Sequence, residues 1–213
     1  MSDSINDTPR AGRLHIGIYG RRNAGKSSLI NAITGHETAI VSDTAGTTTD
    51  PVYKSMEIHG LGPCVLIDTA GFDDIGPMGE LRVEKTRQAL DKTDIALLVL
   101  TGGDMSTEKE WLKAFKARKT PHIVVLNKLD QHSEEELAEL SERIHEEFGQ
   151  KPVCVSASQR IHIDKLREAM LRKVPADWGK LELTGWMCKE GDVVMLVMPQ
   201  DVQAPQGRLI LPQ

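Results

Sequence analysis

The sequence has little of what secreted or membrane proteins need. Its 213 residues include three cysteines, Cys64, Cys154 and Cys188, which are scattered and form no CxxC pair. Such usage is typical of free thiols in a reducing compartment. The longest apolar run, around residues 95–100, is far too short to span a bilayer, and the polar start offers no apolar signal region. We therefore expect a cytoplasmic protein with no signal peptide and no membrane partner.

A basic stripe is also missing. The 26 Lys and Arg residues against 31 Asp and Glu residues give a formal net charge of −5. This balance argues against a nucleic-acid partner, which usually requires clustered positive charge. The seven histidines show no ligand spacing, so we expect no histidine metal centre. The chain is long enough to bury a core without disulfide or metal support.

Short apolar runs alternate with helical patterns along most of the chain, which predicts an α/β fold with a mostly parallel sheet. A glycine-containing turn at residues 60–62 predicts a hairpin, and Ser133 followed by Glu136 predicts a capping box. The expected strands cover residues 14–19, 53–60, 63–69, 94–100, 122–127 and 152–157. The expected helices cover residues 26–35, 81–90, 108–117, 133–148 and 162–174.

The composition divides the chain into three parts. Residues 1–13 are polar and are expected to form a flexible arm. Residues 14–175 carry the strand–helix alternation and are expected to form the main domain. After Pro175 the pattern changes to Gly and Pro punctuation with apolar strand-like runs that have no visible partner. We interpret residues 176–213 as a linker and the start of an incomplete second domain; packing of this tail onto the first domain is the alternative.

The strongest motif has the pattern GxxxxGK[ST] between an expected strand and an expected helix. Its glycines let backbone N–H groups face phosphates, and the helix N-terminus adds its positive end. Lys26 would reach the β- and γ-phosphates, and the Ser27 hydroxyl would bind Mg²⁺. This motif alone leaves ATP and GTP open. The residues expected at the phosphates are Gly20, Arg21, Arg22, Asn23, Ala24, Gly25, Lys26, Ser27 and Ser28.

The base is selected by a second motif, NKxD, formed by Asn127, Lys128 and Asp130 at the end of an expected buried strand. The Asp130 carboxylate can accept hydrogen bonds from the N1–H and the exocyclic amine of guanine, whereas adenine would leave it unpaired. Ser156 and Ala157, at the next strand end, would complete the base pocket through backbone contact. Together the motifs predict a GTP- and GDP-binding G domain of the P-loop NTPase class, with GTP hydrolysis as its activity and a mostly parallel six-stranded sheet covered by helices on both faces.

Two further elements are expected near the terminal phosphate. Asp68 and Gly71 form a DxxG pattern, in which the carboxylate suits Mg²⁺ held through water and the glycine N–H suits the γ-phosphate. Residues 43–50 form a hydroxyl-rich loop that contains Thr47 and Thr48. One threonine of this loop can complete the Mg²⁺ shell when GTP is bound.

This set of motifs resembles the translation-factor-type GTPases that include the tRNA-modification and ribosome-assembly G domains. The resemblance implies Mg²⁺ ligation by Thr48 and an activating K⁺ bound by Asn23. Members of that group commonly have arginine where this chain has Thr49.

A more specific resemblance is to the GTPase of diiron-hydrogenase maturation, carried by residues 47–57, 61–63 and 204–213. It implies a dimerisation domain after the G domain, hence a homodimer through the C-terminal region, and maturation proteins and hydrogenase as partners. That family also has a cysteine and histidine iron–sulfur ligand set. The three cysteines here do not form that set, so we expect this chain to bind no iron–sulfur cluster.

The group that orients the attacking water is the least defined part of the site. Phe72 occupies the position where Ras-like proteins have a glutamine. Asp73, Asp74 and Glu80 follow in the second switch. The resemblance to K⁺-dependent GTPases, which use an acidic residue in that region, implies Glu80 as the candidate, with a solvated helix N-terminal acid as the plain alternative. Catalytic roles are therefore expected for Lys26, Thr48 and Glu80. Two alternative functions stay open: a tRNA-modification or ribosome-assembly G domain, and a GTP-controlled association switch with incidental hydrolysis.

Overall fold

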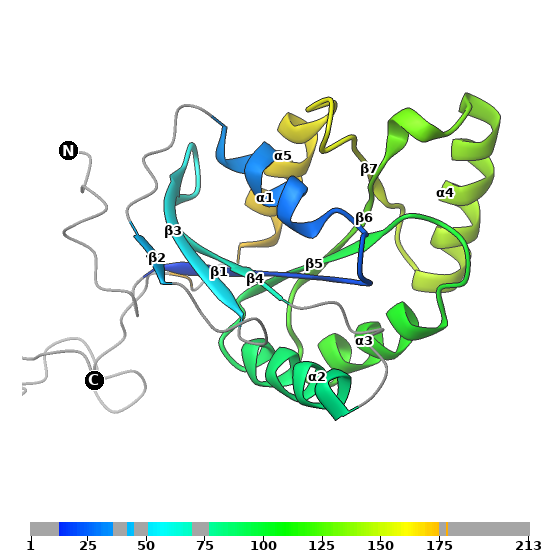
Figure 1. Ribbon diagram of the computed structural model, residues 1–213. Helices are drawn as coiled ribbons and strands as arrows, with labels where there is room; N and C mark the ends of the chain where they lie inside the picture. The colour runs from blue at the N-terminus through cyan, green and yellow to red at the C-terminus, as the bar shows by residue number, and fades with distance from the viewer. Residues whose placement is uncertain (1–12, 36–41, 45–50, 70–76, 175–177, 179–213) are drawn as a thin grey trace, which may run out of the picture.

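The computed structural model describes residues 13–35, 42–44, 51–69, 77–174 and 178 (Figure 1). Seven strands, five α-helices and one short 3₁₀ helix occur in these ranges. In chain order they are β1 (Leu14–Gly20), α1 (Lys26–Thr34), β2 (Ser42–Thr44), β3 (Val52–Ile58), β4 (Gly62–Asp68), α2 (Pro77–Leu90), β5 (Ile95–Leu100), α3 (Ser106–Ala117), β6 (His122–Leu126), η2 (Leu129–Gln131), α4 (Glu134–Phe148), β7 (Val153–Cys154) and α5 (Ile163–Lys173).

One sheet organises the molecule, with the strand order β2-β3-β4-β1-β5-β6-β7. Neighbouring strands from β4 to β7 are parallel, whereas β3 is antiparallel to both β4 and β2. The predicted α/β class with a mostly parallel sheet is confirmed. The sheet has seven strands rather than the expected six, because β2 has only three residues and such a short strand leaves no periodicity in the sequence.

Helices cover both faces of the sheet. In Figure 1, α1 and α5 lie on one side and α2 and α3 on the other. Strand β5 shows why its run is apolar throughout: alternate residues from Ile95 to Val99 join the cluster with α1 and α5, and those from Ala96 to Leu100 join the cluster with α3 and α4. A strand that is buried on both faces needs no polar side.

Local signals in the sequence account for several boundaries. Strands β3 and β4 form the predicted hairpin, from Ile58 paired with Gly62 outward. The predicted capping box is confirmed at α4, where the Ser133 hydroxyl accepts from the Glu136 N–H and the Glu136 carboxylate accepts from the Ser133 N–H. Strand β7 ends earlier than expected, at Cys154, because Ser156 exchanges both backbone hydrogen bonds with Ile161 and the chain turns there.

The parallel strands β1, β4 and β6 end at the same edge of the sheet, as the pairing of Ile18 with Asp68 indicates for β1 and β4. Thr69, directly after β4, links the ends of β4 and β1, because its buried hydroxyl donates to the Ile18 carbonyl at 2.6 Å. The motifs of the sequence follow these strand ends, so the fold gathers them at one edge. No helix within the described ranges is long and apolar enough to cross a membrane.

Candidate nucleotide-binding site

The loop between β1 and α1 has two positions, Gly20 and Gly25, that only glycine fits. Gly25 adopts a left-handed φ of 87°, and a Cβ there would lie 2.3 Å from the Asn127 side-chain nitrogen. A Cβ on Gly20 would lie 2.7 Å from the Val99 carbonyl oxygen. Asn23 is also left-handed, with φ of 61°. This alternation of left-handed residues ahead of a helix N-terminus turns backbone N–H groups toward a common point, which suits an anion.

Lys26, the first residue of α1, extends back across this loop. Its Nζ donates to the carbonyls of Gly20 and Arg21, each at 2.9 Å, and the residue is only 8% exposed. A buried ammonium must be compensated, and these carbonyls hold it at the mouth of the loop. The geometry fits a lysine that meets phosphate oxygens there.

Ser27 and Asp68 come together from α1 and the end of β4. The Ser27 hydroxyl donates to the Asp68 carboxylate at 2.7 Å. Hydroxyl and carboxylate oxygens are the hard ligands that Mg²⁺ prefers, and one or two such protein groups are what a nucleotide-bound Mg²⁺ uses. The two residues expected from the sequence to serve Mg²⁺ are therefore neighbours, and their chemistry fits the ion.

Asn127, directly after β6, links two loops of the site. Its side-chain nitrogen donates to the Ala24 carbonyl at 2.9 Å, and its side-chain oxygen accepts from the Ala157 N–H at 3.1 Å. The residue is 2% exposed. The amide therefore holds the phosphate loop and the 156–157 turn at fixed spacing, which an aspartate or a leucine at this position could not do.

Asp130 lies in η2, where two serines face it. The fully buried Ser156 donates to its carboxylate at 2.5 Å, and Ser158 lies 3.5 Å from both carboxylate oxygens. The Ser156 hydroxyl is the main cause that lowers the pKa of the Asp130 carboxyl, because a hydrogen bond to the ionised form favours it. Asp130 is therefore held as an ionised acceptor, which is the form that can accept two donors from guanine.

The structure brings most of the predicted site together but leaves part of it undescribed. Thr47, Thr48 and Gly71 lie outside the described residues. Glu80 belongs to the first turns of α2. Ser28 is exposed on α1. These positions keep the roles given to them as predictions.

Two side-chain contacts at the site were not expected from the sequence. Ser156 was expected to act through its backbone, yet its side chain holds Asp130. Glu108 in α3 is 4% exposed and contacts Arg21 of the phosphate loop, with 2.9 Å between Arg21 Nε and a Glu108 oxygen. An acidic residue in an amphipathic helix is usually solvated, so only a three-dimensional view could single Glu108 out.

Cys64 and Cys154 lie far apart in the sheet. Cys64 is buried in β4, and burial raises the pKa of its thiol to about 12, whereas Cys154 is half-buried in β7. Three strands separate β4 from β7. Cys188 lies outside the described residues. In the described ranges, no group of three or more His, Cys, Asp and Glu residues could hold a metal ion.

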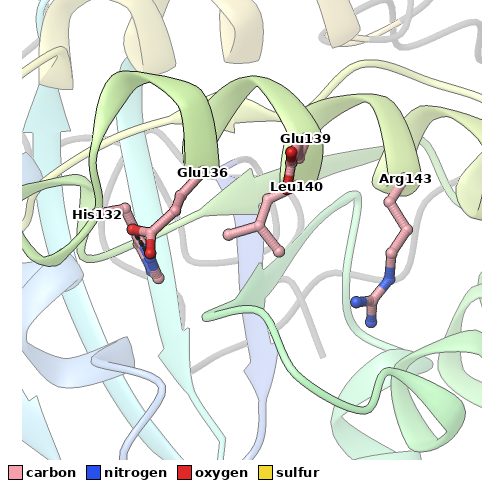
Figure 2. A pocket seen from close by; sticks show the side chains of 5 residues that line it. All are labelled: His132, Glu136, Glu139, Leu140 and Arg143. Atoms are coloured by element: carbon pink, nitrogen blue, oxygen red, sulfur yellow. Dashed lines mark ion pairs between the residues drawn. The ribbon is translucent and has the colours of Figure 1, made fainter.

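A separate groove of about 340 Å³ runs along α4. Figure 2 shows Leu140 between Arg143 and the pair formed by His132 and Glu136, whose facing atoms are 3.7 Å apart. Glu139 completes the lining. None of these five residues belongs to the predicted nucleotide set, so the groove is not the nucleotide site.

The doubly covered parallel sheet, the phosphate loop and the NKxD edge define a P-loop nucleotide-binding protein. The family described as 50S ribosome-binding GTPase matches residues 15–128, more than half of the chain. The chain therefore belongs to this family of GTPases. A second match, to the Hydrogen maturase F dimerization domain, covers residues 183–213.

Curated relatives point to the same activity. GTPase Der of Wolinella succinogenes is 38% identical over 179 residues, which cover 80% of this chain and 37% of that protein. The tRNA modification GTPase MnmE of Aquifex aeolicus is 36% identical over 163 residues, which cover 76% of this chain and 35% of that protein. The chain thus spans about a third of the length of these relatives.

Solved structures with the same fold include Era of Aquifex aeolicus bound to GDP and AlF₄⁻, with a TM-score of 0.63 and 29% identity. The match covers 76% of this chain and 56% of that one. Era in complex with MgGDPNP and a segment of 16S ribosomal RNA matches with a TM-score of 0.64 and 27% identity, over 77% of this chain and 57% of that one.

Proposed function

We propose that this protein is the GTP-binding and GTP-hydrolysing module of a scaffold that matures diiron hydrogenase. The observation that carries the proposal is the match of residues 183–213 to the Hydrogen maturase F dimerization domain, in a chain whose preceding part is a G domain. Residues 1–13 would be an arm, residues 14–175 the G domain, and residues 176–213 a linker and the start of the dimerisation domain. A second copy, the other maturation proteins and the hydrogenase would be the partners, in the cytoplasm.

Within this function, guanine selection rests on Asp130, supported by Asn127, Lys128, Ser156 and Ala157. The hydrogen bonds that hold Asn127 and Asp130 support this assignment, because acceptors fixed before binding lose little conformational entropy when the base arrives. A base that lacks the two guanine donors would leave the remaining lone pairs of the Asp130 carboxylate without donors from the base.

The phosphates would contact the loop from Gly20 to Ser28 and the Gly71 N–H. Lys26 would exchange its carbonyl partners in part for phosphate oxygens. Ser27, Asp68 and, in the GTP state, Thr48 would hold Mg²⁺. When bound, Mg²⁺ neutralises charge on the β- and γ-phosphate oxygens. Catalysis then depends on positioning and charge compensation, with Glu80 as the candidate for orienting water.

Potassium is the second cation of the proposal. Asn23 has an exposed side chain and a left-handed backbone inside the phosphate loop, a setting from which its side-chain oxygen could bind K⁺ beside the phosphates. The absence of arginine from the sequence of residues 43–50 and the presence of Phe72 support a catalytic cation. A cation there would supply charge that an arginine finger supplies elsewhere.

The names of the relatives favour a second candidate, tRNA modification or ribosome assembly. Its support is sequence identity within the G domain. Domains with this fold serve many different roles, so identity there does not determine which role this chain has. A GTP-controlled association switch is the third reading, and it requires partner affinity to differ between nucleotide states. The match at residues 183–213 favours hydrogenase maturation over both.

The test is to disrupt the gene in its native host and to complement it with the wild type or with Lys26→Ala. Two readouts are followed in parallel: diiron-hydrogenase activity in extracts and the modified nucleosides of bulk tRNA. We expect loss of hydrogenase activity, rescue by the wild type, no rescue by Lys26→Ala, and an unchanged tRNA profile. Unchanged hydrogenase activity with altered tRNA would replace the proposal by the second candidate. Rescue by Lys26→Ala would leave a scaffold that does not need GTP.

A further inference from the structure

Arg21, the first residue after β1, turns its side chain away from the phosphate loop and onto helix α3. Its Nε lies 2.9 Å from one Glu108 oxygen and 3.2 Å from the other. Its Nη2 lies 3.4 Å from an Asp104 oxygen and 3.4 Å from the Thr107 hydroxyl. The guanidinium therefore bridges the phosphate loop and the first turn of α3.

The partner of this bridge is buried. Glu108 is 4% exposed, whereas Asp104 is largely open to solvent. A buried carboxylate is retained only when it is paired, and the cost of leaving one partner alone is high. The Arg21–Glu108 pair is therefore the strong member of the contact, and the Asp104 contact is a weak, screened addition.

Helix α3 is a rigid platform for this pair. Trp111 stacks on Tyr19 with ring centroids 5.5 Å apart, and Phe115 meets the same ring at 5.1 Å. Tyr19 is the last residue of β1 before Gly20, and all three aromatic rings are buried. The platform is thus fixed to the strand from which the phosphate loop begins.

The backbone carbonyl of Arg21 connects this residue to Lys26. Its carbonyl accepts from the Ala24 N–H at 3.2 Å and from Lys26 Nζ at 2.9 Å. Rotation of this peptide would move an acceptor that orients the lysine. A side chain anchored on α3 restrains that rotation.

We infer that Glu108 is a positioning residue of the GTPase site: through Arg21 it fixes the carbonyl that orients Lys26 toward the phosphates. This inference rests on the proposed role of Lys26 as a phosphate ligand. It assigns no contact between Glu108 and the nucleotide. It adds α3 to the elements that determine phosphate affinity.

The experiment is a double-mutant cycle in the full chain, with GTP affinity measured by titration and unfolding measured in urea without nucleotide. The cycle combines Glu108→Ala with Lys26→Ala. Glu108→Gln, which keeps the shape of the side chain, is the second variant if Glu108→Ala folds poorly. Glu110→Ala is the matched control, because Glu110 is an exposed acid on the same helix.

Glu108→Ala should weaken GTP binding about tenfold, and it should have less than about a twofold effect once Lys26 is alanine, since groups that act through one another are not additive. In the unfolding measurement the two substitutions should add. Glu110→Ala should change neither quantity. Equal effects of Glu108→Ala in both backgrounds would overturn the inference while leaving the Lys26 assignment intact. Unchanged GTP affinity in Lys26→Ala would overturn both.

Discussion

The two halves of the candidate nucleotide site are braced in different ways. On the base side, the polar groups are held by buried side chains: Asn127 spans two loops, and the fully buried Ser156 fixes Asp130. On the phosphate side, Lys26 bonds to backbone carbonyls, and Ser27 bonds to Asp68 at an exposed position.

The difference has a functional consequence. Groups of the base side can keep their partners when the base binds, because a carboxylate has about four lone-pair sites and the Ser156 hydroxyl uses only one of them. Groups of the phosphate side satisfy one another and must exchange those bonds for ligand oxygens and Mg²⁺. Base selection is therefore preorganised, whereas phosphate binding depends on what holds the loop during the exchange.

The largest effect is expected when the hydrogen-bond acceptor of the base side, Asp130, is changed. Asp130→Asn should reverse the preference between GTP and xanthosine triphosphate, by a combined factor on the order of 10⁴, since a site built for a hydrogen-bonding partner strongly rejects the mismatched one. The new amide donates to the xanthine 2-oxygen. Competitive titration of both nucleotides measures the factor, with Asp164→Asn as the control at an exposed acid of α5. Unchanged GTP affinity would contradict the assignment of Asp130.

The next largest effect is expected when Asn127, which links the two loops, is replaced. Asn127→Ala leaves the Ala24 carbonyl and the Ala157 N–H without their buried partner, at a cost of about 1–3 kcal/mol each. We expect GTP affinity to fall by on the order of 10²–10³-fold, together with a lower midpoint of urea unfolding. Asn127→Asp keeps an acceptor for Ala157 but places a buried carboxylate oxygen against the Ala24 carbonyl oxygen, so its defect should be at least as large. Unchanged GTP affinity in Asn127→Ala would contradict the assignment of this amide as a brace between the two loops.

A smaller effect addresses the phosphate side. GTP turnover should be at least about tenfold faster in KCl than in NaCl at equal ionic strength, compared with roughly 10³–10⁵-fold from an arginine finger in other systems. Asn23→Ala should lose this preference. Asn31→Ala removes an exposed amide from α1 and should keep it. A K⁺ preference that persists in Asn23→Ala would move the cation elsewhere, and equal wild-type rates in both salts would remove it.

Much of this architecture follows from local sequence signals. The doubly covered strand β5 was identifiable because its apolar run has no polar side, and α4 was identifiable from Ser133 and Glu136. Strand β2 could not be predicted, since three residues hold no period and its pairing with β3 depends on tertiary context. The early end of β7 was not predicted either, because it depends on the backbone pairing of Ser156 with Ile161 across the following turn.

The relative placement of several candidate residues was predictable where a motif fixes both chemistry and spacing. Lys26, Ser27 and Asp68 come together as their motifs imply, and so do Asn127 and Asp130. The supports were not predictable, because they join residues far apart in the chain: Glu108 lies 87 positions from Arg21, and Asn127 lies 103 from Ala24. A single sequence holds no signal for such pairs, since each partner alone resembles an ordinary surface or loop residue.

The smallest expected effect is a pH dependence of the free energy of unfolding, and it concerns Glu108, the residue that holds Arg21 on the phosphate side. Burial raises the pKa of the Glu108 carboxyl above its ordinary value of 4.5, while the Arg21 charge opposes this shift and Asp104 adds to it. A carboxyl with a raised folded-state pKa favours folding when it is protonated, so its contribution is fully present below about pH 4.5 and is lost as pH rises through the folded-state value.

The free energy of unfolding of the wild type, minus that of Glu108→Gln, should therefore decline as pH rises above 4.5, because the glutamine does not titrate. Taking the difference cancels the other carboxyls. In an Arg21→Ala background the decline should steepen, since the charge that opposes the effect of burial is gone. Urea unfolding at several pH values measures both curves, with Glu110→Gln, a change at an exposed acid of the same helix, as the control. A flat Glu108 curve in both backgrounds would mean that this carboxyl is solvated in solution, and the phosphate side would then lack the brace that α3 offers it.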